Sequence, residues 1–221
     1  SGVEKLVVNG ANSNAISLVL SATAFAAGIR TVDLTGDTNV AGINVINAST
    51  QADTTKGLSL LGSAGADSIT GGTGADTITG GAGADSIVGG TGADSIFGGS
   101  GDDTIVGEQA DALIDGGSET DLLQVGANFT PTTDGQLTGI EAVTLTAAVL
   151  TLNLATQTEP FTINGFATGT STIVGGMSED SITGGSGPNT ITGGGGVDTL
   201  VGGTGADTFV YNTMAEFVSG N

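Results

Sequence analysis

Apolar side chains return every nine residues along much of this chain. The first regular series is Ile69, Ile78, Ile87, Ile96, Ile105, Ile114 and Leu123, and the second is Ile182, Ile191, Leu200 and Phe209. Small and polar residues fill the intervals, so each nine-residue phrase predicts a loop followed by a short strand with one inward side chain. A period of this kind predicts a solenoid in which two phrases make one turn.

The period continues more loosely outside these two series. Inward positions between them are expected at Leu145, Leu154, Ile163 and Ile173, with Val143, Leu152 and Phe161 repeating beside them. The N-terminal part predicts strands near Leu6 to Val8, Ile16 to Leu20, Val32 to Leu34 and Ile43 to Ile46. Ser17 to Gly28 is rich in small apolar residues, and we interpret it as strand and turn rather than as a signal peptide, because no basic segment precedes it.

A fixed frame of glycine and aspartate accompanies the apolar period. Its order is Gly, Gly, x, Gly, x, Asp, x, apolar, x, and it runs without a gap from Gly71 to Val106 and again from Gly175 to Val210. Glycine adopts positive φ at little cost and lets backbone carbonyls turn inward, where a hard cation can use them. The aspartates of the frame are Asp67, Asp76, Asp85, Asp94, Asp103, Asp121, Asp180, Asp198 and Asp207.

Stacking of the turns would bring these aspartates together. Residues eighteen apart lie about 4.8 Å from one another in parallel pairing, which places Asp67 over Asp85 and Asp76 over Asp94. Carboxylates that close repel strongly unless a divalent cation lies between them. We therefore expect several Ca²⁺ ions and calcium-coupled folding, and disfavour a merely solvated acidic face. Besides the aspartates and Asn189, the expected metal ligands are Gly71, Thr73, Gly80, Ala82, Gly89, Thr91, Gly98, Ser100, Gly184, Gly193, Gly202 and Thr204.

These tandem phrases resemble the RTX, or haemolysin-type calcium-binding nonapeptide repeat, family of secreted bacterial proteins. Good matches cover Gly62 to Val106, Gly116 to Gln124 and Gly175 to Val210, less than half of the chain. The resemblance implies an all-β fold, a right-handed parallel β-roll or β-helix solenoid with calcium between the glycine-rich loops. It also implies type I secretion in unfolded form and folding outside the cell when calcium is met.

Several phrases depart from the frame. Ser63 replaces the second glycine of the phrase that begins at Gly62, and Asn189 replaces the aspartate between Gly184 and Thr192. Asn189 can offer one carbonyl oxygen, which predicts a weaker site. Between Gly107 and Asp115 the acid comes one place early, at Asp111, and Ala112 takes the ligand position. This turn is expected to bind metal poorly or not at all.

The pattern divides the chain into five segments. Residues 1–61 are predicted to form irregular solenoid strands, 62–124 the first RTX block, 125–174 a motif-poor parallel coil, 175–210 the second RTX block, and 211–221 a partial cap or the truncated start of a C-terminal region. Asp33, Asp37 and Asp53 lie outside the motif and are expected to be solvated turn residues.

Composition excludes several classes of binding partner and of catalytic site. The formal charge is −20, from 23 acidic and 3 basic residues, which argues against nucleic acid or an anionic membrane as partner. No apolar stretch is long enough for a membrane span. The chain has no His and no Cys, so zinc sites, thiol chemistry and histidine-based triads are excluded, and we expect no enzyme activity.

Three functions remain open at this point. The favoured one is the calcium-binding region of a Gram-negative RTX-type S-layer protein at the cell surface, with self-association into a lattice and anchoring to cell-surface polysaccharide through other parts. The phrases GVEKLVV, GIRTVDL and GIEAVTL, which begin at Gly2, Gly28 and Gly139, resemble those of that class. The alternatives are an export and folding module of a secreted hydrolase or toxin, and a segment of a calcium-stiffened adhesin.

Overall fold

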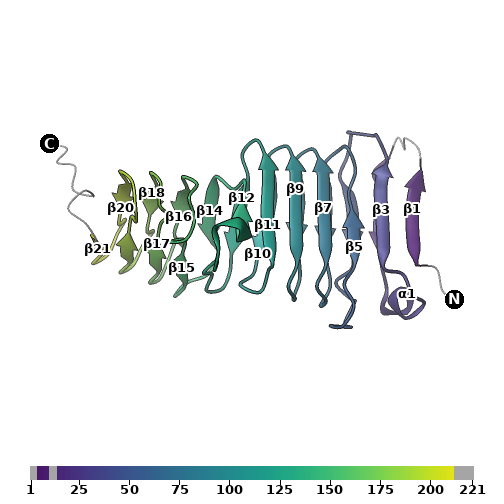
Figure 1. The fold of residues 1–221 in the computed structure, drawn as a ribbon, viewed down its shortest axis with the longest axis horizontal. Helices are drawn as coiled ribbons and strands as arrows, with labels where there is room; N and C mark the ends of the chain where they lie inside the picture. The colour runs from purple at the N-terminus through teal and green to yellow at the C-terminus, as the bar shows by residue number, and fades with distance from the viewer. Residues whose placement is uncertain (1–3, 10–13, 212–221) are drawn as a thin grey trace. The chain divides into compact units, whose positions relative to one another are not determined.

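The protein is described by a computed structural model that covers residues 4–9 and 14–211. Strands pair in parallel throughout these residues, and the chain divides into two compact units, Ser1–Asp121 and Leu122–Asn221. Successive strands alternate between the sheets of each unit, so the chain coils as a solenoid (Figure 1). The predicted all-β class is confirmed.

The first unit is built from two parallel sheets. One contains β1 (Lys5–Asn9), β3 (Thr31–Gly36), β5 (Ser59–Leu61), β7 (Thr77–Ala82), β9 (Ser95–Ser100) and β11 (Leu113–Ser118). The other contains β2 (Ser17–Val19), β4 (Asn44–Asn47), β6 (Asp67–Thr70), β8 (Ser86–Val88) and β10 (Thr104–Gly107). All four strands predicted in the N-terminal part are present, as β1 to β4.

The register of these strands confirms the eighteen-residue turn. Ile78 pairs with Ile96 in one sheet, and Ile69 pairs with Ile87 in the other. The turns before the glycine-rich loops are longer, since Lys5 pairs with Thr31 and Asn44 pairs with Asp67. The solenoid therefore begins before the motif does, with longer loops between its strands.

The core of the first unit is a column of single apolar side chains. Its members are Ile46, Leu60, Ile69, Ile78, Ile87, Ile96, Ile105 and Ile114, each at most 1% exposed. Burying one such side chain stabilises the fold by about 1.5–3 kcal/mol relative to leaving it exposed. In the glycine-loop turns each short strand supplies one inward apolar residue, so the core there is narrow and depends on regular stacking.

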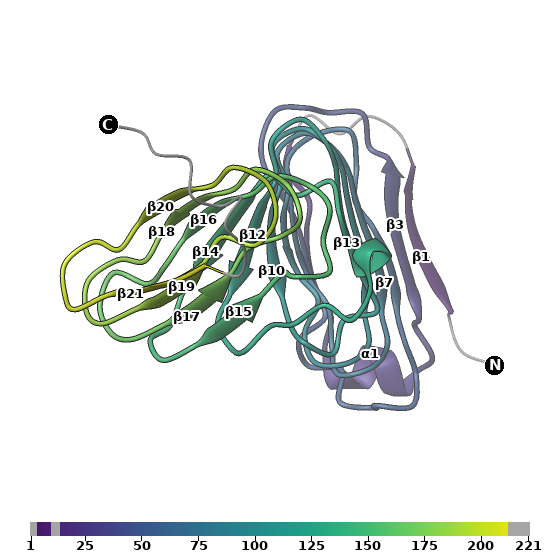
Figure 2. The ribbon, with the colours of Figure 1, turned by 60° about the vertical axis from the view of Figure 1, so that its left-hand side comes forward.

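The second unit has the same plan with a different core. One sheet runs through β12 (Leu122–Val125), β14 (Ala142–Leu145), β16 (Thr162–Asn164), β18 (Ser181–Thr183) and β20 (Thr199–Val201). The other runs through β15 (Thr151–Asn153), β17 (Thr172–Val174), β19 (Thr190–Thr192) and β21 (Thr208–Val210), as Figure 2 shows. A short 3₁₀ helix, η1 (Asp134–Gln136), leads into β13 (Leu137–Thr138).

The motif-poor stretch continues the coil, as the sequence predicts. Its predicted inward positions are all buried, namely Val143, Leu145, Leu152, Leu154, Phe161, Ile163 and Ile173. Val143 pairs with Ile163 and Leu152 pairs with Ile173, so these turns are longer than the glycine-loop turns. Phe129 adds a fully buried ring, which gives this stretch a bulkier core.

One N-terminal element differs from the prediction. Ser17 to Gly28 begins with a strand, but α1 (Ala22–Ala26) replaces the expected turn. The Ser21 side chain caps this helix by accepting a hydrogen bond from Ala24 N at 3.3 Å, and Phe25 is buried beneath it. Small residues around one buried aromatic side chain permit a helix of one turn. The nine-residue period of apolar positions does not predict such a short helix.

Within residues 4–9 and 14–211, no helix has the length and apolarity needed to cross a bilayer. Of the segment expected to be a partial cap, residues 212–221 lie outside the described residues.

The narrow core generates a first prediction. Ile96 is stacked between Ile78 and Ile114, and Ile96→Ala should lower the free energy of unfolding by about 2–5 kcal/mol in saturating calcium. Val88→Ala removes apolar atoms from a half-buried position and should cost about 1 kcal/mol or less. Denaturant titration followed by circular dichroism compares them, and equal costs would contradict the single-column core.

Candidate metal centre

The aspartates of the frame lie where the glycine-rich loops enter the strands. Asp67 is the first residue of β6. The other four come immediately before a strand, Asp76 before β7, Asp85 before β8, Asp94 before β9 and Asp103 before β10. All five side chains belong to residues at most 3% exposed. Charged side chains are therefore held inside the fold at every turn of the first block.

Backbone amides join these aspartates from turn to turn. Oδ1 of Asp85 accepts a hydrogen bond from Asp67 N at 2.8 Å, and the same bond links Asp103 Oδ1 to Asp85 N at 2.7 Å. Equivalent bonds join Asp76 N to Asp94, Asp103 N to Asp121 and Asp180 N to Asp198 at 2.8–2.9 Å. We call this series the aspartate ladder. The predicted stacking of aspartates eighteen residues apart is confirmed.

The second carboxylate oxygen, Oδ2, differs from Oδ1 because it does not accept a ladder bond. Oδ2 of Asp85, Asp94 and Asp103 is buried and has no hydrogen-bond partner among the described residues. In Asp76 and Asp180 the same atom accepts one bond from a loop amide, from Gly72 N at 2.8 Å and from Gly176 N at 2.6 Å. Because a buried anionic oxygen without a partner is strongly unfavourable, these positions favour a cation.

Burial also makes these carboxylates hard to ionise without metal. Desolvation, together with the charges of Asp103 and Asp67, raises the pKa of Asp85 to about 8, while a hydrogen bond from Asp67 N acts in the opposite direction. Desolvation likewise raises the pKa of Asp94 to about 6 and that of Asp180 to about 6. Such raised values arise when negative charge is brought into the fold without a compensating positive charge.

The first glycine of each phrase lines the space beside Oδ2. A Cβ on Gly89 would lie 2.6 Å from Asp94 Oδ2, and one on Gly80 would meet both Asp85 Oδ2 and the carbonyl oxygen of Gly98, the latter at 2.6 Å. A carboxylate and a carbonyl from the next turn thus converge where any other residue would place a methyl group. The second glycine is required for a different reason, since Gly81 has a φ of 119°.

This donor set fits calcium. Carboxylate and backbone carbonyl oxygens are the ligands that Ca²⁺ prefers. In the part of the chain that the structure describes, no three acidic side chains gather so that they alone could hold a metal ion. Each ion would therefore need carbonyls as well as carboxylates, with residues such as Asp85, Asp103 and Gly98 as the holders.

The other residues expected as ligands fall into two groups. The first-place glycines Gly71, Gly80, Gly89, Gly98, Gly184, Gly193 and Gly202 all lie beside the carboxylate or amide of their own loop. The third-place residues Thr73, Ala82, Thr91, Ser100 and Thr204 lie in half-buried or exposed parts of the loops. Asp198 and Asp207, in the last described turns, are half-buried. Ligation by all these residues stays a prediction.

The loop of Gly107 to Asp115 is built differently. Asp111 is buried, and its Oδ2 accepts a hydrogen bond from Glu108 N at 2.7 Å, so it closes its own turn. Ala112 occupies the ladder position, and its amide donates to Asp94 O at 2.8 Å. Desolvation, together with the charges of Asp94 and Glu108, raises the pKa of Asp111 to about 7, while the hydrogen bond from Glu108 N acts in the opposite direction. The side chain is engaged locally, in keeping with the expectation of a poor site.

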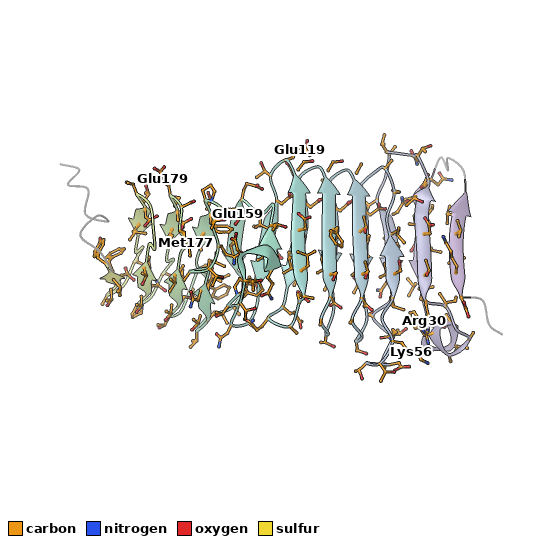
Figure 3. All side chains as sticks on the ribbon, viewed as in Figure 1. Arg30, Lys56, Glu119, Glu159, Met177 and Glu179 are labelled. Carbon is orange, nitrogen blue, oxygen red and sulfur yellow. The ribbon has the colours of Figure 1, made fainter. Side chains whose placement is uncertain are left out.

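Three acidic residues were missed or misjudged from sequence. Asp33 was expected to be a solvated turn residue, but it lies in β3 and its Oδ2 forms an ion pair with Lys5 Nζ at 2.9 Å. Glu119 stands at the third-glycine place with a φ of 78°, and its Oε2 accepts a hydrogen bond from Gly101 N at 2.8 Å (Figure 3). Comparison with the frame could have found it. Asp37 was expected to be solvated but is fully buried, accepting bonds from Asn39 N at 3.1 Å and Asn44 Nδ2 at 3.3 Å. The longer N-terminal turn folds over it, which no local pattern indicates.

The raised pKa values predict an unusual pH dependence for the metal-free chain. Asp85 and Asp94 bind protons more tightly in the folded chain than in the unfolded chain, where they are protonated only in the ordinary carboxylate range. The metal-free folded form is therefore most stable in acid and loses stability as pH rises through about 6 to 8. In excess chelator, circular dichroism should therefore show more strand at pH 5 than at pH 9. Equal strand content at both values would contradict uncompensated burial of these carboxylates.

Removal of one ladder carboxylate should weaken calcium binding. Asp85→Ala deletes an unpartnered Oδ2 and its ladder bond, so the calcium concentration at half-transition should rise by about tenfold or more. Asp115→Ala removes the same charge from the outward side of β11 and serves as the matched control. An equal shift in both variants would indicate that only net charge matters.

Comparison with known families agrees with this geometry. A family model, the RTX calcium-binding nonapeptide repeat, matches in four copies at residues 61–96, 79–114, 88–123 and 174–209. No curated protein matches the chain. RTX repeats bind several Ca²⁺ ions per array, and they imply a calcium-binding module of a secreted protein. The chain therefore carries RTX calcium-binding nonapeptide repeats in two blocks, at residues 61–123 and 174–209.

Proposed function

We propose that this chain is a calcium-set structural module of a secreted cell-surface protein, and that copies of it associate into a surface lattice of the S-layer type. The aspartate ladder carries the first part of the proposal. Its buried Oδ2 atoms at Asp85, Asp94 and Asp103 have no hydrogen-bond partner in the described part of the chain, so calcium completes the fold outside the cell.

Charge and architecture support the lattice. The chain has a net charge of −20, and exposed acids such as Glu119 and Glu179 lie on its loops, so copies repel one another until divalent ions neutralise or bridge them. The coil between 125 and 174 adds a packed stretch without glycine-rich loops. An export module needs no such stretch, whereas a structural protein gains a stiff spacer from it.

We further propose a structural rather than catalytic role. The chain contains no His and no Cys, and its buried aspartates are engaged in the ladder. Anchoring to cell-surface polysaccharide would fall to parts outside this sequence. Type I secretion fits this role, because the metal-free chain carries too much buried charge to fold early.

A calcium titration of the chelator-treated chain tests both parts of the proposal, the calcium-dependent fold and the assembly into a lattice. Circular dichroism should report a coil-to-strand transition, and light scattering and electron microscopy should report growth of sheets or filaments. Magnesium at equal concentration is the control and should give no transition, because it demands a smaller octahedral site.

The outcomes separate the alternatives. Strand formation in a persistent monomer would contradict the lattice and favour an export and folding module or a segment of an adhesin. The absence of any transition with calcium would contradict the calcium-set fold itself.

A further inference from the structure

Asn189 takes the place of a ladder aspartate in the second block, and its orientation is fixed. Its Oδ1 accepts a hydrogen bond from Ser171 N at 2.9 Å, the bond that Oδ1 of an aspartate makes elsewhere. Because the backbone amide of Ser171 is a donor, the side-chain amide must present its oxygen to it. The Nδ2 group therefore points to the side where the aspartates place Oδ2.

The contacts of Nδ2 show what this exchange does. Nδ2 donates to the carbonyl oxygen of Gly187 at 2.8 Å and to Asp207 Oδ1 at 3.4 Å. A Cβ on Gly184 would lie 3.0 Å from this nitrogen, just as a Cβ on Gly89 would lie 2.6 Å from Asp94 Oδ2. An N–H donor thus occupies the position of the oxygen that faces the candidate metal centre.

Buried amides make similar contacts beside the first block. Nε2 of Gln51 donates to two loop carbonyls, Asp53 O at 2.7 Å and Lys56 O at 2.8 Å, while its Oε1 accepts a bond from Thr73 N. Asn44 pairs in register with Asp67, accepts a ladder-type bond from Ile16 N at 2.8 Å, and donates from Nδ2 to Ser63 Oγ at 3.0 Å. In both residues the side-chain N–H groups donate hydrogen bonds to oxygen atoms of the loops.

We propose that the Asn189 amide replaces a calcium ion in its loop. Nδ2 donates to the carbonyl oxygen of Gly187, which would otherwise face a cation. Its N–H groups carry the same sign of partial charge as the cation, so they exclude it. Asn189 is thus a specificity-determining residue that sets the calcium count of the second block. The proposal rests on calcium binding by the loops and is independent of lattice assembly.

Restoring the carboxylate tests this directly. Asn189→Asp should bind one more calcium ion per chain than the wild type, measured by elemental analysis after gel filtration in saturating calcium. Asn164→Asp adds the same charge at an exposed position of β16 and should leave the count unchanged. Equal counts for Asn189→Asp and wild type, or an equal gain in Asn164→Asp, would overturn the proposal.

The reverse exchange is the second test and does not depend on the folding of Asn189→Asp. Asp85→Asn and Asp85→Ala should both lose one calcium ion, but the amide of Asp85→Asn can donate to the loop oxygens in the ion's place. In saturating calcium, Asp85→Asn should therefore unfold at a higher denaturant concentration than Asp85→Ala. Identical midpoints would contradict replacement of the ion by an amide.

Discussion

The glycine-loop turns depend on a buried carboxylate that recurs in most phrases and accepts a hydrogen bond from a backbone amide of the preceding turn. Asp85 shows the constraint in full, since Asp67 N donates to its Oδ1 while its Oδ2 is buried without a partner among the described residues. A hydrogen bond on one oxygen links successive turns, and burial of the other oxygen favours a cation beside it. The frame glycines follow from the same constraint, because a Cβ at Gly89 would fill the space beside Asp94 Oδ2.

The two kinds of turn balance charge and apolar burial differently. In the glycine-loop turns each strand contributes one inward side chain, such as Ile87 or Ile105, so little apolar surface is available to offset buried charge. The coil between 125 and 174 has no such loops, and it buries larger groups, including Phe129 and Phe161. The same parallel plan therefore has stacked aspartates and a narrow apolar core in one stretch and a bulkier apolar core in the other.

Much of the fold could be predicted because a strict period expresses a repeated physical requirement. The inward positions from Ile69 to Leu123, the stacking of Asp67 on Asp85 and the continuation of the coil through the motif-poor stretch all follow from spacing alone. Helix α1 and the burial of Asp37 could not be predicted, because they arise where the turns lengthen and tertiary packing decides. The role of Asn189 was equally hidden, since the direction of an amide depends on which backbone group faces it.

Amide hydrogen exchange in calcium and in chelator tests the central claim most directly. The backbone amides of Asp67, Asp76, Asp85 and Asp103 donate the ladder bonds. If calcium completes the ladder, these amides should be strongly protected in calcium at neutral pH and should lose that protection together in chelator. Equal protection in both conditions would contradict the account, because the buried carboxylates would then be held by the protein alone.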